Sequence, residues 1–169
     1  HEMAGIYAQQ GQVDQAIYLY QQSIDIKESI GNVQGKAATL HQMAGIYARQ
    51  GQVDQAIALY QQSLEITERI GNVQGKAYTL HQMAGIYVKQ GQVDQAIALY
   101  QQSLEIKERI GDVGGKAYTL ANMGYLSANN GDFQTAISYL QESLTILQHL
   151  KSPDAATVQS WLEQVTRKK

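Results

Sequence analysis

The sequence of 169 residues has no cysteine, a single proline and no long apolar run. Without cysteine the chain cannot be a disulfide-stapled domain, and it offers no thiolate metal ligand and no cysteine nucleophile. No stretch approaches the roughly 20 apolar residues that a membrane-spanning helix needs. We therefore expect a cytoplasmic chain that is held together by packing and does not enter a membrane.

The chain also lacks a surplus of charge of either sign. Lysine and arginine together number 13 and aspartate and glutamate 15, which gives a net charge of −2. Binding to nucleic acid phosphates depends on a basic surplus, so a nucleic acid partner is not expected.

Motifs for catalysis and for cofactor binding are missing as well. The sequence has no phosphate loop ending in GK[ST] and no G-x-S-x-G motif. Gly114-Gly115-Lys116 comes nearest, but it lacks the earlier glycine and the hydroxyl residue after the lysine. The sequence therefore predicts a protein that is not an enzyme and carries no cofactor.

What the sequence does contain is an internal repeat of 40 residues. The stretch HQMAGIYARQGQVDQAIALYQQS begins at residue 41 and recurs almost unchanged from residues 81 and 1, and a divergent copy begins at Ala121. Repeats of this length bury their apolar side chains only against their neighbours. We predict one solenoid over residues 1–150, with repeats at 1–34 (truncated at its N-terminus), 35–74, 75–114 and 115–150.

Each repeat is predicted to be a pair of helices. The first helix, at about 76–90 in the third repeat, has apolar residues at i, i+3, i+4 and i+7: Leu80, Met83, Ala84 and Tyr87. Gly91 follows its end, and Asp94 lies in the first turn of a second helix that runs to Gly111.

One more helix is predicted after the repeats, within residues 151–169. Ser152-Pro153-Asp154 is typical of a helix start, because proline is tolerated in a first turn. A single apolar stripe follows at helical spacing: Val158, Trp161, Leu162 and Val165. We expect this helix to cap the C-terminal end of the array.

The repeat resembles the tetratricopeptide repeat. The family pattern W-x2-L-G-x2-Y…A-x3-F is matched by Leu40, Met43, Ala44, Tyr47, Ala56 and Tyr60. Two departures are a length of 40 in place of 34 and Glu28, Glu68 and Glu108 where a proline usually ends the second helix. Forty-residue versions are similar to those of kinesin light chain, the Pins/LGN adaptors and large bacterial proteins. The resemblance implies an all-α, right-handed superhelix of antiparallel helix hairpins that serves as a protein-interaction scaffold.

Partner binding is expected in a groove on the faces of the first helices that turn away from the core. Aromatic and arginine side chains often anchor a partner, and amides can bond a peptide backbone. The positive charges there favour an acidic segment with a hydrophobic anchor. Alternatively, these are only solvated polar positions. The candidates are His41, Gln42, Arg49, Lys76, Tyr78, His81, Gln82, Lys89, Tyr118, Asn122 and Tyr125.

One histidine per repeat stands on this face, at His1, His41 and His81. Helices that pack about 8–10 Å apart cannot bring equivalent side chains onto one zinc ion, so no metal site is predicted. Imidazoles that gain charge as the pH falls through about 6.5 would instead make the groove pH-dependent.

Glycines at positions 5, 45 and 85 lie inside predicted helices, where glycine costs roughly 1 kcal/mol relative to alanine. One interpretation is a smooth groove floor that admits a ligand backbone. The other is close helix packing. Substitution by alanine separates the two.

Core-type side chains stand at the N-terminal end of the array, where no repeat covers them: Met3, Ile6 and Tyr7. Uncapped solenoid ends can stack on one another. Self-assembly into a homo-oligomer through this edge is therefore the alternative function.

Overall fold

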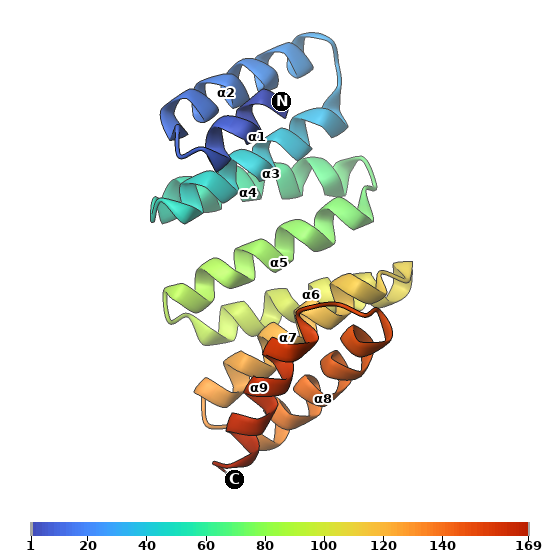
Figure 1. Ribbon diagram of the computed structural model, residues 1–169. Coiled ribbons are helices and arrows are strands. Elements are labelled where there is room, and N and C mark those ends of the chain that lie inside the picture. The colour runs from blue at the N-terminus through green and yellow to red at the C-terminus, as the bar shows by residue number, and fades with distance from the viewer. Residues whose placement is uncertain (1, 169) are drawn as a thin grey trace. The chain divides into compact units, whose positions relative to one another are not determined.

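The structure, a computed structural model, describes residues 2–168, and every regular element among them is an α-helix (Figure 1). The helices are α1 (Glu2–Gln9), α2 (Val13–Ser29), α3 (Val33–Arg49), α4 (Val53–Arg69), α5 (Val73–Lys89), α6 (Val93–Ile110), α7 (Val113–Asn129), α8 (Phe133–His149) and α9 (Ala155–Thr166). The all-α prediction, the two helices per repeat and the C-terminal helix are confirmed.

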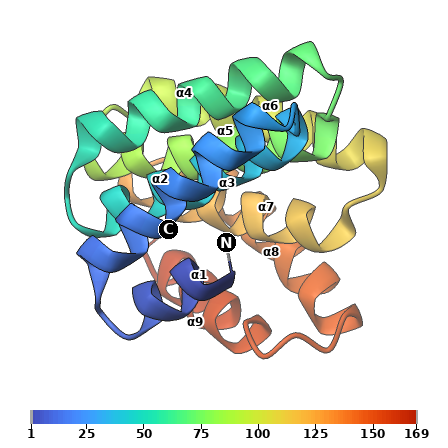
Figure 2. The same cartoon turned by 90° about the horizontal axis from the view of Figure 1, so that it is seen from above.

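The helices form two compact units, unit 1 up to Ile86 and unit 2 from Tyr87 onward, and the boundary falls within α5. In unit 1, α1 packs on α2, α2 on α3 and α3 on α4. In unit 2, α6 packs on α7, α7 on α8 and α8 on α9. Figure 2 shows these neighbours within each unit from a second direction. Helices that follow one another in sequence are thus neighbours in space.

Glycines spaced 20 residues apart end the helices. From Gly11 to Gly131, seven of them have a positive φ of 70–83°. Only glycine adopts this left-handed conformation without strain, so each one reverses the chain after a helix. At the next position in this series stands Lys151, which has a φ of 52°.

Small residues line the faces through which the helices pack. The alanines at matching repeat positions are fully buried, at 0% exposure: Ala4, Ala44 and Ala84 on the first helices, and Ala16, Ala56, Ala96 and Ala136 on the second. Without larger side chains between them, the backbones of two helices can approach closely. These residues are the small positions of the predicted pattern.

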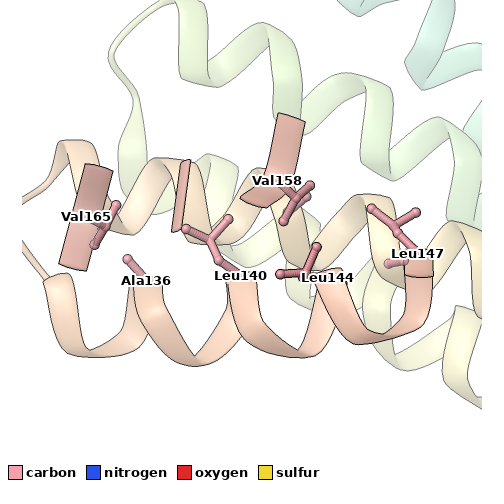
Figure 3. Close-up of a cluster of buried hydrophobic side chains, with 8 residues drawn as sticks. Ala136, Leu140, Leu144, Leu147, Val158 and Val165 are labelled. Carbon is pink, nitrogen blue, oxygen red and sulfur yellow. The ribbon is translucent and has the colours of Figure 1, made fainter. Parts of the chain in front are cut away.

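The core of unit 2 includes the capping helix α9. Leu140, Leu144 and Leu147 of α8 point toward Val158 and Val165 of α9, as Figure 3 shows. Burial of an aliphatic side chain of this size contributes about 1.5–3 kcal/mol. The C-terminal helix therefore closes the apolar surface of the last hairpin, as predicted.

Ion pairs tie each hairpin to the next. The Nζ atoms of Lys36, Lys76 and Lys116 lie 2.9, 2.8 and 2.9 Å from Oε1 of Glu28, Glu68 and Glu108. These glutamates are the residues that replace the usual proline of the repeat. Each exposed pair contributes at most about 1 kcal/mol.

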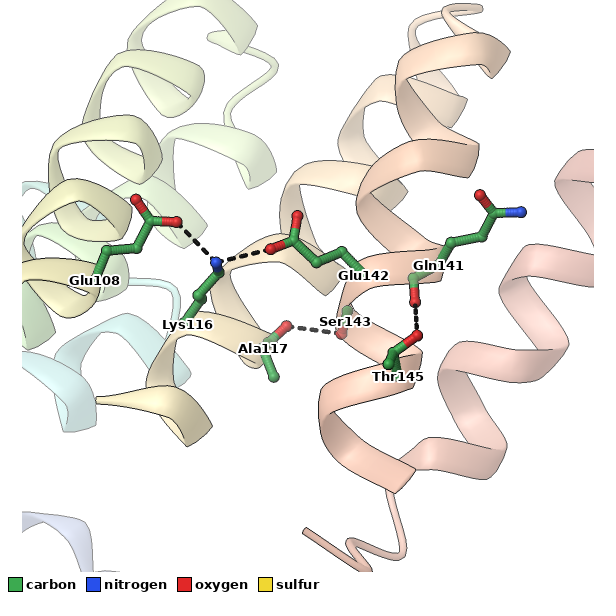
Figure 4. A network of polar contacts seen from close by, with 7 residues as sticks. All are labelled: Glu108, Lys116, Ala117, Gln141, Glu142, Ser143 and Thr145. Atoms are coloured by element: carbon green, nitrogen blue, oxygen red, sulfur yellow. Dashed lines mark hydrogen bonds and ion pairs between the residues drawn. The ribbon is translucent and has the colours of Figure 1, made fainter. Parts of the chain in front are cut away.

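Lys116 also binds a second carboxylate. Its Nζ lies 2.7 Å from Oε1 of Glu142 on α8 (Figure 4). Hydrogen bonds from Glu108 and Glu142 raise the pKa of Lys116. Nearby, Ser143 donates a hydrogen bond of 2.8 Å to the carbonyl oxygen of Ala117. Lys116 thus links α6, α7 and α8.

One lysine in unit 2 is buried. Lys107 is 2% exposed, and its Nζ donates to Oγ1 of Thr119 at 2.9 Å and to the carbonyl oxygen of Gly115 at 3.3 Å. Burial lowers its pKa from 10.5 to about 8, against the opposing effect of the Asp112 charge. The folded state therefore releases this proton more readily than the unfolded chain.

The Lys107 pKa predicts a rise in stability with pH. Between pH values of about 8 and 10 the unfolded chain keeps the proton and the folded chain loses it, so the free energy of unfolding increases. Urea unfolding at a series of pH values should show this rise in the wild type. Lys107→Leu should lack it, since leucine stands at the matching position, Leu147. Equal pH dependence in both proteins would contradict the assignment.

Candidate functional site

Unit 1 has a groove across the exposed side of α1, α3 and α5, with a cavity volume of about 470 Å³. Side chains from α2 and α4 reach its floor from below. The lining residues are Gly5, Ala8, Gln9, Tyr20, His41, Gln42, Gly45, Ile46, Arg49, Tyr60 and Gln82. We call this set the groove of unit 1.

Tyrosine hydroxyls form the floor of the groove beneath the glycines. A Cβ atom added at Gly5 would lie 3.6 Å from Oη of Tyr20, and one added at Gly45 would lie 3.4 Å from Oη of Tyr60. Both contacts leave room for a methyl group. Close packing therefore does not demand glycine at these two positions, and the smooth-floor interpretation is the one that fits the geometry.

Arg49 supplies the positive charge of the groove. Its Nη1 would lie 3.9 Å from a Cβ at Gly45, so the guanidinium extends over the floor. Burial raises the pKa of Tyr60 to about 12 and also raises that of Tyr20, and in both cases the Arg49 charge opposes the shift. One cation thus acts on two buried hydroxyls, which stay protonated at neutral pH.

A second cavity of about 230 Å³, which we call the side pocket, lies between α3, α4 and α5. His41 lines both cavities. Its Nδ1 lies 3.0 Å from Oγ1 of Thr79, and its ring packs edge-on against Tyr60 at a centroid distance of 5.2 Å. Burial lowers the His41 pKa below 6.5. His41 therefore stays neutral at pH 7 and gains charge only at a lower pH than the sequence predicts; His1 lies outside the described residues.

The structure brings several of the predicted residues together in unit 1. His41, Gln42, Arg49 and Gln82 line the groove, and Tyr78 lines the side pocket beside His41 and Gln42. His81 is half-buried. Lys76 is instead placed in the ion pair with Glu68, and neither of the two linings includes it.

In unit 2 the predicted aromatic residues contact the capping helix. The Oη of Tyr118 donates a hydrogen bond of 2.7 Å to Oδ2 of Asp154, which precedes α9. The rings of Tyr125 and Trp161 lie 5.1 Å apart at an interplanar angle of 43°. This part of the α7 face is therefore already engaged by the chain itself. Lys89 is exposed and Asn122 half-buried in the same unit.

Sequence reasoning missed the floor of the groove. It assigned Tyr60 to the core pattern, and only the pairing of each helical glycine with a tyrosine on the following helix could have pointed to the floor.

Neither a metal centre nor a membrane span is found in the part of the chain that the structure describes. No three histidine, aspartate, glutamate or cysteine side chains among residues 2–168 come together as a metal site. None of the described helices is both long and apolar enough to cross a bilayer.

A family model described as tetratricopeptide repeat matches the sequence over residues 1–69, 35–109 and 75–149. The chain belongs to the tetratricopeptide repeat (TPR) family. Membership confirms the resemblance predicted from the repeat pattern and supports the assignment of the chain as a protein-interaction scaffold. No curated protein sequence matches it.

Solved structures of TPR-like proteins share the fold at low sequence identity. BtubC (BKLC) from P. vanneervenii is 20% identical, with a TM-score of 0.89 over 97% of this chain and 69% of that one. A putative kinesin light chain from Podosopora anserina with nearly identical TPR-like repeats is 24% identical, with a TM-score of 0.79 over 99% and 83%.

The Rap proteins are longer relatives in structure. Apo RapI is 16% identical, with a TM-score of 0.88 over 98% of this chain and 46% of that chain. A Rap protein complexed with Competence and Sporulation Factor is 18% identical, with a TM-score of 0.82 and coverages of 98% and 47%. This TPR chain thus spans about half the length of either Rap protein.

Two glycine substitutions are expected to have opposite effects. Gly45→Ala should raise the free energy of unfolding by about 0.5–1 kcal/mol, because alanine fits and favours the helix. Gly124→Ala should lower it by about 1–3 kcal/mol, because the new Cβ would lie 2.7 Å from Cγ of Leu140 and 3.2 Å from the Ala136 carbonyl oxygen. Urea unfolding of both variants measures the difference. Stabilisation by Gly124→Ala would contradict the packing described for α7 and α8.

Proposed function

We propose that this TPR chain is a non-catalytic scaffold that binds an extended peptide or partner segment in the groove of unit 1. The observation that carries the proposal is the position of Arg49 over a floor of tyrosine hydroxyls, flanked by amide side chains. The Rap protein solved with Competence and Sporulation Factor supports partner binding by this fold.

The groove chemistry favours an acidic segment with a hydrophobic anchor. A carboxylate can accept charge-assisted hydrogen bonds from the Arg49 guanidinium. Gln42 and Gln82 carry amides that both donate to and accept from a peptide backbone. Tyr78, which is 40% exposed, offers an aromatic surface beside the groove. We place this interaction in the cytoplasm, with neither nucleic acid nor membrane as the partner.

The Arg49 assignment can be tested with peptides selected from a random display library on the intact chain. The selected peptides should be enriched in Asp and Glu. Arg49→Ala should weaken their binding by roughly tenfold, equivalent to about 1.4 kcal/mol, the loss expected for one charged hydrogen bond. Isothermal titration calorimetry measures the two dissociation constants.

Arg69→Ala is the matched control, because Arg69 lines a separate cavity with Glu65 and Lys36. This variant should bind the selected peptides as the wild type does. Equal loss of affinity in both variants, or selection of basic peptides, would refute an acidic ligand at Arg49.

Self-assembly through the N-terminal edge is the second candidate function. Met3 and Ile6 are 60% and 52% exposed, whereas Met43 and Ile46, at the same repeat positions, are 6% and 3% exposed. Tyr7, the third predicted edge residue, is half-buried. Positions that are buried in the second repeat are thus uncovered in the first, which favours a second copy stacked on this edge.

Light scattering coupled to size-exclusion chromatography tests the edge. If it mediates assembly, the mass of the wild type should rise above 18.7 kDa with concentration. Ile6→Glu should remain a monomer, because a charge cannot be buried in an apolar contact without a large cost. A wild-type mass that is independent of concentration would exclude this function.

A further inference from the structure

The second helices of the repeats differ at one inward-facing position. Lys27, Thr67, Lys107 and Leu147 stand there, 40 residues apart. Thr67, Lys107 and Leu147 are all buried, at 3%, 2% and 1% exposure. Threonine is much shorter than the other residues, so the second repeat has less side chain to fill the same place.

The lysines at this position bind a threonine of the following helix. Thr119 donates its hydroxyl hydrogen to the Gly115 carbonyl oxygen at 2.9 Å and accepts a hydrogen bond from Lys107. Thr39 likewise donates to the Gly35 carbonyl oxygen and accepts from Lys27. An ammonium group at the end of an alkyl chain is thus the native occupant of this place in two repeats.

In the second repeat the ammonium is missing although its acceptors are present. Thr79 donates to the Gly75 carbonyl oxygen at 2.9 Å, as its counterparts do. Thr67 is too short to reach it and instead bonds the Leu64 carbonyl oxygen at 2.8 Å. His41 takes the place of the lysine as the partner of Thr79.

The side pocket lies where the longer side chain would run. It has a volume of about 230 Å³, and Thr67, Gly75 and Thr79 are among its lining residues. They match Lys107, Gly115 and Thr119 in unit 2, where Lys107 is fully enclosed. The replacement of lysine by threonine therefore accounts for a cavity at this repeat and for its polar lining.

We propose that the side pocket binds a primary amine on an unbranched alkyl chain, which occupies the place that Lys27 and Lys107 fill in their own repeats. The alkyl chain runs along Thr67, and the ammonium donates to Oγ1 of Thr79 and to the Gly75 carbonyl oxygen. A lysine side chain of a bound protein and a free alkylamine share this chemistry. The site is separate from the acidic-peptide contact proposed at Arg49.

The neutral lining sets the strength of this site. Asn72 stands where Asp112 stands beside Lys107, so the pocket lacks that carboxylate. Asn32 holds the same position beside Lys27, which shows that an amide there is compatible with an ammonium. Weak binding is expected, and binding should strengthen where the aspartate is present.

The test is a titration of the intact chain with n-butylamine at constant ionic strength, followed by the amide NMR signals of Gly75 and Thr79. The wild type should show saturable shifts at these residues, and n-butanol should not reproduce them. Thr67→Lys should abolish the shifts, because its own ammonium fills the pocket. Lys107→Thr should create a second site, at Gly115 and Thr119, with higher affinity because Asp112 lies beside it.

Titration with Nα-acetyl-lysine methylamide, against its norleucine counterpart, identifies the source of the amine. Saturable shifts with the lysine compound alone would assign the pocket to a lysine side chain of a partner. Shifts with n-butylamine but with neither amino acid derivative would assign it to a small free amine.

Three results would overturn the proposal. They are equal shifts in the wild type and Thr67→Lys, equal binding of n-butanol, and no saturable shift in the wild type when Lys107→Thr binds the amine. None of them bears on the groove, because no peptide is present.

Discussion

The packing of small residues between paired helices is the constraint on which the rest of the structure depends. Because the alanines at these positions are fully buried, each second helix lies close to the first helix of its hairpin. At this separation a tyrosine on the second helix reaches under the first. Its hydroxyl arrives beneath Gly5 in one hairpin and beneath Gly45 in the next. The floor of the groove is therefore a consequence of the core and needs no additional element.

Near-identity between repeats does not make their surfaces equivalent. Gly45 leaves the groove of unit 1 open, whereas Tyr125 at the matching position packs against Trp161 of the capping helix. Thr67 leaves a side pocket where Lys107 fills its own repeat. In each case a single substitution within a constant backbone decides whether a cavity is present. The departures from the repeat thus mark the functional positions.

The sequence was sufficient to predict the helices, their turns and the capping helix, because apolar spacing and glycines every 20 residues are local signals. It also placed His41, Gln42, Arg49 and Gln82 on one face, since helical geometry fixes which side chains share a face. It could not show that Lys76 pairs with Glu68 or that Tyr118 bonds Asp154. Those contacts depend on the relative positions of different helices, which a one-dimensional pattern does not contain.

Mapping a bound acidic peptide by amide NMR shifts tests the central claim most directly. The account predicts that the shifts cluster on the groove of unit 1, around Gly5, Gly45 and Arg49, and that Tyr118 and Tyr125 beside the capping helix remain unaffected. Shifts that cluster instead around Glu65 and Arg69, or on α9, would show that the partner binds elsewhere and would contradict the account.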